Sequence, residues 1–282
     1  MSTPIPKVLT VAGSDPSGGA GVQADIKTMS ALGAYATSVV TALTAQSTRG
    51  VAGVHAVPVD FVRLQLDTLL ADIVPDATKI GMLATAELAD TVGEYLPDLA
   101  YTVLDPVMVA TSGDRLLDAD AMDAVRRLCR RADLITPNLS EAAALLGRPV
   151  ARSVAEMRHQ AELLIQDGTC RVLLKGGHLT GVATDVYADA DGILLLPGRR
   201  VHTRNTHGTG CTLSSAIAAL RPQRDSWQAT VRDAKKYLTG ALAHADALGV
   251  GHGHGPVHHY YELWAGDPTR RPPGSNGRTR PE

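Results

Sequence analysis

The sequence is poor in aromatic residues. Phe, Trp and Tyr make up 4% of the 282 residues, and Phe61 is the single phenylalanine. So few rings leave little platform for stacking nucleic-acid bases. The formal net charge of −2 gives no electrostatic footprint for phosphate backbones either. We therefore expect no nucleic-acid partner, and a core built from Val, Leu, Ile and Ala.

Cysteine and long apolar runs are also scarce. The three cysteines, Cys129, Cys170 and Cys211, are odd in number and far apart, which fits neither a disulfide framework nor a CxxC metal site. No apolar run approaches the roughly 18 residues of a transmembrane helix. The N-terminus leads into a strand within a few residues, which leaves no room for a signal peptide. We expect a cytoplasmic protein with no membrane partner.

Strand-like apolar runs alternate with helical patterns along the chain. The run Lys7–Gly13 precedes a helical pattern at 20–32, while Tyr35–Gln46 and Val51–Val57 are expected as strands without a long helix between them. Such alternation predicts an α/β fold with a largely parallel sheet covered on both faces. We expect one domain over residues 1–266. The remainder, 267–282, is rich in Pro, Gly and Arg and is expected to be disordered.

The most informative segment is a glycine-rich turn that leads directly into a helix of small residues. It contains Gly208, Thr209, Gly210 and Cys211, and the predicted helix covers Thr209–Leu220. Free N–H groups and the positive end of the helix dipole make such a start an anion site. The same position favours the thiolate of Cys211. The segment predicts a phosphate site beside a candidate reactive group.

Polar residues follow several of the predicted strands, where ligands bind in parallel sheets. Asp105 ends one strand and can hold Mg²⁺, although a turn-forming Asp is the alternative. Asn138 and Glu141 open a helix at the edge of the sheet where ligands bind, and are expected to serve the site; the alternative, a helix cap with a first-turn acid, explains the helix but not this position. Lys175 ends an apolar strand before two glycines and can reach a nucleotide phosphate; the alternative is a solvated lysine.

The loop Gly13–Gly21 is expected to hold substrate, because it matches neither a Walker loop nor a clean dinucleotide motif. Asp25 on the following helix faces either the pocket or solvent. Gln46 offers a donor and an acceptor to a heterocycle edge. Met82 and Val107 can enclose a flat ring between them.

Four histidines near the end of the chain allow a zinc hypothesis: His252, His254, His258 and His259. No cysteine or carboxylate completes an obvious ligand set in the sequence. A polar turn is the favoured interpretation.

Together these motifs resemble the hydroxymethylpyrimidine/phosphomethylpyrimidine kinases of bacterial thiamine biosynthesis, within the ribokinase-like superfamily. The similarity covers about residues 7–265. The matching stretches include AGSDPSGGAGVQADIKTMSALGAY, TALTAQSTRGV, TKIGML, LDPVM, LITPNLSEAAALL, LLKGGH, NTHGTGCTLSSAIAALRP and GVGHGHGPVHH.

The resemblance implies a three-layer α/β/α sandwich, usually a homodimer. It also implies two successive MgATP-dependent steps on 4-amino-5-hydroxymethyl-2-methylpyrimidine, first to the monophosphate and then to the pyrophosphate. It assigns the pyrimidine site to Gly13, Asp25, Gln46, Met82, Val107 and Cys211. It assigns MgATP and the transferring phosphoryl group to Asp105, Asn138, Glu141, Lys175 and the Gly208–Cys211 turn, with Lys235 as a nucleotide neighbour.

The sequence departs from typical ribokinase-like kinases at one position. The family loop Gly-Ala-Gly-Asp is Gly-Thr-Gly-Cys here, so the usual aspartate base is absent and Cys211 is the candidate base. A pyridoxal kinase is the nearest alternative function. A non-catalytic pyrimidine or nucleotide sensor is a further alternative, although a sensor has no need of the complete MgATP set.

Overall fold

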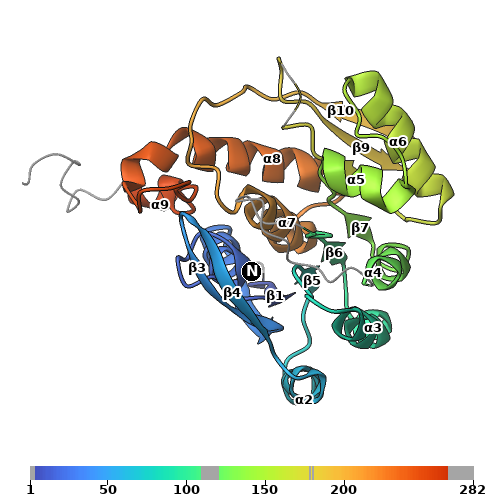
Figure 1. The fold of residues 1–282 in the computed structure, drawn as a ribbon, viewed down its shortest axis with the longest axis vertical. Helices are drawn as coiled ribbons and strands as arrows, with labels where there is room; N and C mark the ends of the chain where they lie inside the picture. The colour runs from blue at the N-terminus through green and yellow to red at the C-terminus, as the bar shows by residue number, and fades with distance from the viewer. Residues whose placement is uncertain (1–3, 109–120, 178, 180, 266–282) are drawn as a thin grey trace, which may run out of the picture.

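An eight-stranded sheet forms the centre of the computed structural model, which describes residues 4–108, 121–177, 179 and 181–265 (Figure 1). The predicted tail at 267–282 lies outside these residues. In spatial order the strands are β10 (Gly192–Leu196), β9 (Asp185–Asp189), β8 (Val172–Leu174), β7 (Leu134–Ile135), β6 (Thr102–Leu104), β5 (Ala77–Ile80), β1 (Lys7–Ala12) and β2 (Tyr35–Val40). Neighbours from β8 to β2 run parallel, and β9 and β10 join antiparallel. The predicted, largely parallel sheet is confirmed.

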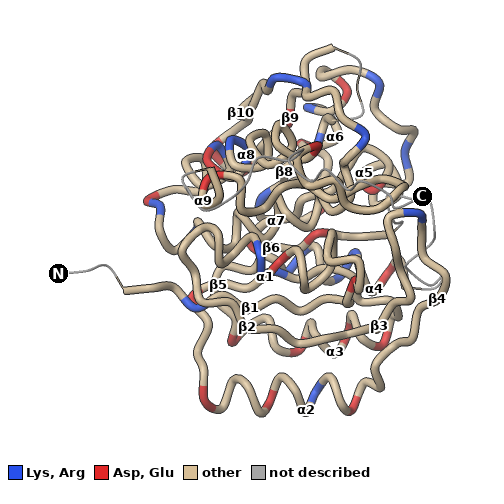
Figure 2. Tube along the Cα trace, turned by 90° about the vertical axis from the view of Figure 1, so that its left-hand side faces the viewer, with Lys and Arg blue, Asp and Glu red and all other residues tan. Residues whose placement is uncertain are grey.

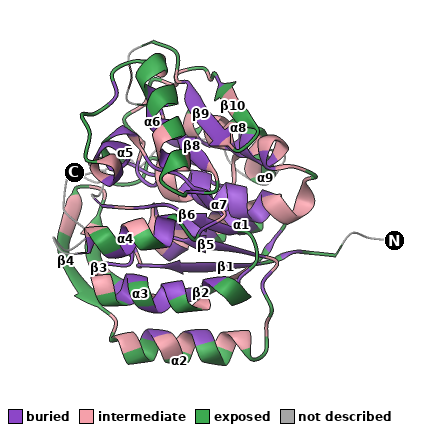
Figure 3. Ribbon diagram, turned by 90° about the vertical axis from the view of Figure 1, so that its right-hand side faces the viewer, coloured by how far each residue is buried: buried purple, intermediate pink, exposed green. Residues whose placement is uncertain are grey.

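Helices cover both faces of this sheet (Figure 1). One layer consists of α1 (Gly21–Ala31), α7 (Thr209–Leu220) and α8 (Trp227–Ala243), and the other of α2 (Val59–Leu70), α3 (Ala86–Tyr95), α4 (Met122–Cys129), α5 (Leu139–Leu146) and α6 (Val154–Gln166). Side chains alternate along a strand, so Val8 packs in the first layer and Leu9 in the second. Figure 3 shows the central strands buried between the layers. The predicted three-layer sandwich is confirmed.

The expected strand Tyr35–Gln46 is divided in two, so that part of the prediction is wrong. Its first part, β2, joins the main sheet, whereas β3 (Ala42–Ser47) pairs with β4 (Gly50–Ala56) in a separate antiparallel hairpin. Thr41 separates them because its N–H donates to Ala12 and its hydroxyl donates to the Met82 carbonyl. These bonds tie the base of the hairpin to the carboxyl ends of β1 and β5.

Short 3-10 turns follow α3, at Leu96–Asp98, and α7, at Arg221–Gln223. After α8 come a short 3-10 turn, Ala245–Leu248, and the small helix α9 (Tyr261–Ala265). Among the described residues, no helix is long and apolar enough to cross a membrane. Acidic and basic residues are interspersed over the face that Figure 2 shows.

Candidate active site

Two glycine-rich segments that lie far apart in the sequence pack directly against each other. Gly208 is the N-cap of α7 with a φ of 77°, and a Cβ there would lie 1.7 Å from the carbonyl oxygen of Gly19. A Cβ on Gly19 would in turn lie 2.3 Å from the His207 ring. Only glycine permits this approach and this backbone conformation. The two predicted ligand loops therefore form one continuous surface.

A buried carboxylate fastens these loops together. Asp15 Oδ2 lies 2.7 Å from His207 Nε2 and accepts hydrogen bonds from the Gly19 and Ala20 N–H groups. Burial acts to raise the pKa of Asp15, but the bonds from His207 and Ser17 outweigh it and hold this pKa at about 2. Asp15 is thus an ionised anchor. Asp15 is expected from the sequence as a polar residue at the end of a strand, but its contact with His207 is not.

A lysine and two carboxylates meet at the carboxyl ends of β6 and β8. Lys175 Nζ lies 2.8 Å from Asp105 Oδ1 and 3.9 Å from Glu141 Oε2. Thr136 donates a further hydrogen bond to Asp105 Oδ1 at 3.2 Å. Both Asp105 and Glu141 are buried, so Lys175 is no freely solvated lysine. The structure therefore brings these three predicted residues together.

Asn138 and Glu141 form a capping box at the start of α5. The Glu141 N–H donates to Asn138 Oδ1 at 2.9 Å, and the Asn138 N–H donates to Glu141 Oε2 at 2.7 Å. The helix-cap interpretation is thus confirmed. The same box aims Glu141 toward Lys175. Burial raises the pKa of Glu141 to about 7; Lys175 opposes this rise and Asp105 adds to it.

The first turn of α7 faces this cluster. A Cβ on Gly210 would lie 3.1 Å from Asp105 Oδ2 and 3.3 Å from Lys175 Nζ. The N-terminal end of a helix dipole thus stands beside one ammonium and one carboxylate. Gly210, in the Gly208–Cys211 turn that also contains Thr209, thus lies beside Asp105 and Lys175; the roles of all these residues stay predictions.

The expectation that Cys211 favours the thiolate is wrong. Burial raises the pKa of the Cys211 thiol to about 11; Lys79 opposes this rise, and Asp25 and Asp105 add to it. Desolvation and the nearby carboxylates thus favour the neutral thiol over the thiolate.

Asp25 forms a buried ion pair that the sequence analysis did not foresee. Its Oδ2 lies 2.7 Å from Lys79 Nζ, and both side chains have an exposed fraction of 0%. Thr10 and Ser215 also donate to this carboxylate, at 2.6 and 2.7 Å. The alternative of a solvent-exposed Asp25 is wrong. Because these three donors occupy the carboxylate beneath the site, direct contact with a substrate stays a prediction.

Lys79 could have been found from the sequence. It interrupts Ala77–Ile80, a strand whose four residues are all buried. A lysine inside such an apolar run requires a buried anion. Asp25 carries that anion on the buried face of α1, together with Val22 and Met29.

Of the predicted pyrimidine contacts, Gly13 and Met82 lie together. A Cβ on Gly13 would lie 3.2 Å from Met82 Sδ, so a glycine keeps this surface open. Gln46 Nε2 lies 3.5 Å from His207 Nε2, which places Gln46 beside the joined loops. Val107 follows Asp105 and is partly exposed. Its part in enclosing a ring stays a prediction.

Lys235 on α8 is engaged outside the Asp105–Glu141–Lys175 cluster. Its Nζ lies 2.6 Å from Asp185 Oδ2 and 2.9 Å from the Ala183 carbonyl oxygen. Asp185 Oδ1 accepts the Gly176 N–H at 2.8 Å, directly after Lys175. Lys235 thus supports the glycine pair that follows β8, and a direct nucleotide contact stays a prediction.

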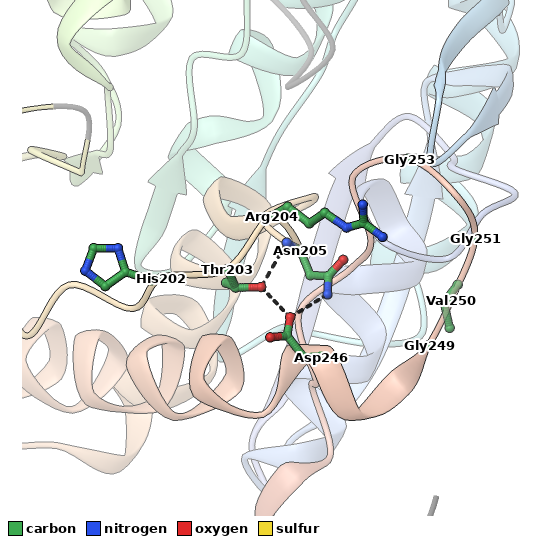
Figure 4. Close-up of a pocket in the computed structure, with 9 residues that line it drawn as sticks. All are labelled: His202, Thr203, Arg204, Asn205, Asp246, Gly249, Val250, Gly251 and Gly253. Carbon is green, nitrogen blue, oxygen red and sulfur yellow. Dashed lines mark hydrogen bonds between the residues drawn. The ribbon is translucent and has the colours of Figure 1, made fainter. Parts of the chain in front are cut away.

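A polar cavity of about 600 Å³ lies beside the segment that leads into the glycine turn (Figure 4). Thr203 and Asn205 both donate to Asp246 Oδ1, at 2.5 and 2.6 Å, as the dashed lines in Figure 4 show. Asn205 Oδ1 also accepts the Gly255 N–H. None of the predicted site residues lines this cavity. Its side chains anchor the chain on which the turn is built.

The four C-terminal histidines do not assemble a zinc site. His254 Nδ1 lies 3.1 Å from the Arg204 carbonyl oxygen, and His259 Nε2 lies 3.2 Å from Thr212 Oγ1. Within residues 4–108, 121–177, 179 and 181–265, no group of three or more His, Cys, Asp or Glu side chains is placed to hold a metal ion. Asp105 and Glu141 supply two carboxylates, one fewer than the three side chains that such a group requires.

Comparisons with known proteins agree on one family. The model of the phosphomethylpyrimidine kinase family matches residues 15–258. A hydroxymethylpyrimidine/phosphomethylpyrimidine kinase of Escherichia coli is 52% identical over 260 residues, covering 91% of this chain and 98% of the relative.

Solved structures of two kinases are similar to this one. A Staphylococcus aureus pyridoxal kinase in complex with AMP-PCP and pyridoxal has a TM-score of 0.84 at 32% identity, covering 92% of this chain and 95% of that chain. A Clostridium difficile phosphomethylpyrimidine kinase has a TM-score of 0.74 at 38% identity, covering 84% and 99%. Both likenesses extend over most of the fold described above.

Proposed function

The chain belongs to the phosphomethylpyrimidine kinase family, and on that premise we propose that it transfers phosphoryl groups from ATP in two steps. The first acceptor is the hydroxymethyl group of 4-amino-5-hydroxymethyl-2-methylpyrimidine. The second acceptor is the phosphate of the resulting monophosphate. The chain is an ATP-dependent kinase of thiamine biosynthesis, and the order and chemistry of the two steps are the proposal.

The observation that carries this proposal is the meeting of the α7 N-terminus with Lys175 and Asp105. Phosphoryl transfer depends mainly on alignment and on stabilising charge over the equatorial oxygens. Lys175 and the amides of Gly208–Cys211 would hold the transferring group, because both offer donors at the same point. Gly13, Gln46 and Met82 lie on the adjoining loops, where the pyrimidine would bind.

Asp105 and Glu141 would hold Mg²⁺. Together with Lys175 they leave one negative charge in excess when ionised, and the pKa of Glu141 near 7 reports an uncompensated buried carboxylate. Mg²⁺ is bound by one or two protein carboxylates together with substrate phosphates, so two carboxylates suffice. When bound, the metal neutralises charge on the phosphates. Asn138 orients Glu141 through the capping box.

Cys211 would not need to act as a strong base in either step. A thiol whose pKa burial raises to about 11 is a poor resting base at pH 7. A loose transition state places little demand on a base, because the proton can leave late. In the second step the acceptor is already an anion and needs no base. A neutral side chain at 211 is therefore compatible with both steps.

Pyridoxal phosphorylation is a second candidate activity. It is favoured by the structural match to a pyridoxal kinase at a TM-score of 0.84. Pyridoxal also carries a hydroxymethyl group on a nitrogen heteroaromatic ring, so both alcohols pose the same positioning problem. The identity of 52% to the E. coli pyrimidine kinase favours the pyrimidine as the principal substrate.

The deciding experiment is an incubation with MgATP and hydroxymethylpyrimidine, in which mono- and diphosphorylated products are followed by mass. We expect both products in sequence, and a higher kcat/KM for the pyrimidine than for pyridoxal. A monophosphate that never advances would refute the second step. Tight pyrimidine binding without ATP turnover would instead establish a sensor. Sedimentation of the same sample tests the homodimer.

A further inference from the structure

The buried pair Lys79–Asp25 is hydrogen-bonded to α7, the helix whose first turn is the proposed phosphoryl site. Together with two hydroxyl groups the pair forms a cluster of four side chains from separate elements: Thr10 from β1, Asp25 from α1, Lys79 from β5 and Ser215 from α7. Ser215 stands one helical turn after Cys211 in α7, so its hydrogen bond to Asp25 links the buried pair to the helix that carries Cys211.

Stability alone is a weak reason for such a pair. Removing two charges from water costs several kcal/mol per ion, and apolar residues of similar volume are often as stable or more stable. The ammonium also restricts its surroundings, because a Cβ on Gly81 would lie 2.6 Å from Lys79 Nζ. Both the desolvation of the ion pair and the restriction at Gly81 are explained if the fixed cation has a role in the adjoining site.

The pair adds charged groups near the first turn of α7. The groups that face Cys211 are Lys79 on β5, Asp25 on α1, Asp105 after β6, and Lys175 after β8. Burial opposes the charge on Lys79, but Asp25, Cys211 and Asp105 together keep its pKa above the usual value, so it remains a cation. Lys79 therefore offsets carboxylate charge where an anion is to bind.

We propose that Lys79 is a positioning residue for phosphoryl transfer, which acts through Asp25 and Ser215 on the first turn of α7 and balances carboxylate charge around Cys211. This inference rests on the proposed kinase function. Lys79 has an exposed fraction of 0%, so it acts through its neighbours rather than by touching substrate. The hydrogen bond from Ser215 to Asp25 fixes α7 relative to the buried pair, and the Lys79 ammonium supplies the positive charge.

The effect of the Lys79 and Asp25 charges on Cys211 is tested by measuring how fast iodoacetamide alkylates Cys211 at pH 8 in a Cys170→Ser background. That background is needed because Cys170 is exposed, whereas Cys129 is buried. Lys79→Met should slow alkylation about three- to tenfold, since Asp25 then stands uncompensated. Asp25→Asn should accelerate it by a similar factor. Because no substrate takes part, this result is independent of the proposed function.

The two directions separate charge from packing. A merely structural pair would loosen in both variants and expose the thiol, so alkylation would accelerate in both. Changes of the same sign, or no change in either variant, would overturn the proposal. In turnover assays, Lys79→Met should lower kcat about tenfold or more with a smaller change in the KM for ATP.

Two milder substitutions test the proposal if neither Lys79→Met nor Asp25→Asn folds. Ser215→Ala removes one donor to Asp25, whereas Ser214→Ala removes a hydroxyl whose hydrogen bonds, among the described residues, go to the carbonyls of Gly210 and Cys211. Both changes have the same size in the same helix. We expect kcat to fall about three- to tenfold in Ser215→Ala and to stay within about twofold in Ser214→Ala. Equal kcat values at equal thermal midpoints would refute the link.

Discussion

Asp15 Oδ2 and His207 Nε2 lie 2.7 Å apart although 192 residues separate them in the chain. Their contact joins the loop after β1 to the turn before α7. The pKa of Asp15 near 2 shows that the folded state favours its charged form. Because Gln46 also lies against His207, this pair holds the predicted substrate side and the predicted phosphate side in one arrangement.

The Asp15–His207 pair predicts a specific dependence on acid. The folded-state pKa of Asp15 is below its unfolded value of about 3.9, so the stabilisation is complete above pH 4 and is lost as the pH falls through 2. Its size is about 2 kcal/mol. Asp15→Asn should lower the free energy of unfolding at pH 6 and flatten its decline between pH 4 and 2. Urea unfolding at several pH values measures this.

An exposed aspartate provides the control for Asp15→Asn. Asp60 in the first turn of α2 is exposed and takes part in no ion pair that the described residues contain. Asp60→Asn should leave the pH dependence of unfolding unchanged within about 0.5 kcal/mol. An Asp15→Asn profile that matches this control would contradict the assignment.

The arrangement could be predicted from the sequence only in part. Strand and helix alternation gave the layers, and polar residues at strand ends gave Asp105, Glu141 and Lys175, because parallel strands bring their carboxyl ends to one edge. The Asp15–His207 and Asp25–Lys79 pairs were not foreseen. Each joins segments whose register depends on tertiary packing, so a local pattern can show that Lys79 needs an anionic partner but does not identify that partner.

The error at Cys211 has a related physical cause. A helix N-terminus is visible in the sequence and argues for a lower thiol pKa. Burial and the carboxylates of Asp25 and Asp105 are visible only after folding, and they act in the opposite direction. The sign of a pKa shift therefore could not be predicted from the motif alone.

Gly208 should tolerate no side chain. Gly208→Ala requires a Cβ 1.7 Å from the Gly19 carbonyl oxygen and an alanine at a φ of 77°, so the loops must separate. We expect a loss of at least about 2 kcal/mol in stability and kinase activity below about 1%. Gly53→Ala is the control, because a Cβ there meets nothing within 4 Å. Similar thermal midpoints for the two variants would disprove the close approach.

Lys175 should be required for turnover more than for folding. Lys175→Met removes the cation that lies 2.8 Å from Asp105, and Asp105 and Glu141 then repel each other and the ATP phosphates. We expect kcat/KM for ATP to fall about 10²- to 10³-fold, the usual cost of losing one charge-stabilising donor. Steady-state kinetics at saturating pyrimidine measure it.

A surface lysine provides the comparison for Lys175. Lys236 on α8 is exposed and forms no ion pair within the part of the chain that the structure describes. Lys236→Met should change kcat/KM for ATP less than about twofold. Loss of activity in both variants, to a similar degree, would show that overall positive charge rather than the position of Lys175 matters.

Cys211→Asp tests why a thiol stands where the resemblance to ribokinase-like kinases leads us to expect an aspartate. The new carboxylate would join Asp25 and Asp105 and face the anionic acceptor of the second step. Two unit charges about 4 Å apart interact by about 4 kcal/mol at an effective dielectric near 20. We expect the second step to slow about a hundredfold or more relative to the first. Single-turnover assays started from the alcohol and from the monophosphate measure each step separately. Cys211→Asn is the uncharged control of the same size, and equal slowing of the second step in both variants would rule out charge as the reason for the cysteine.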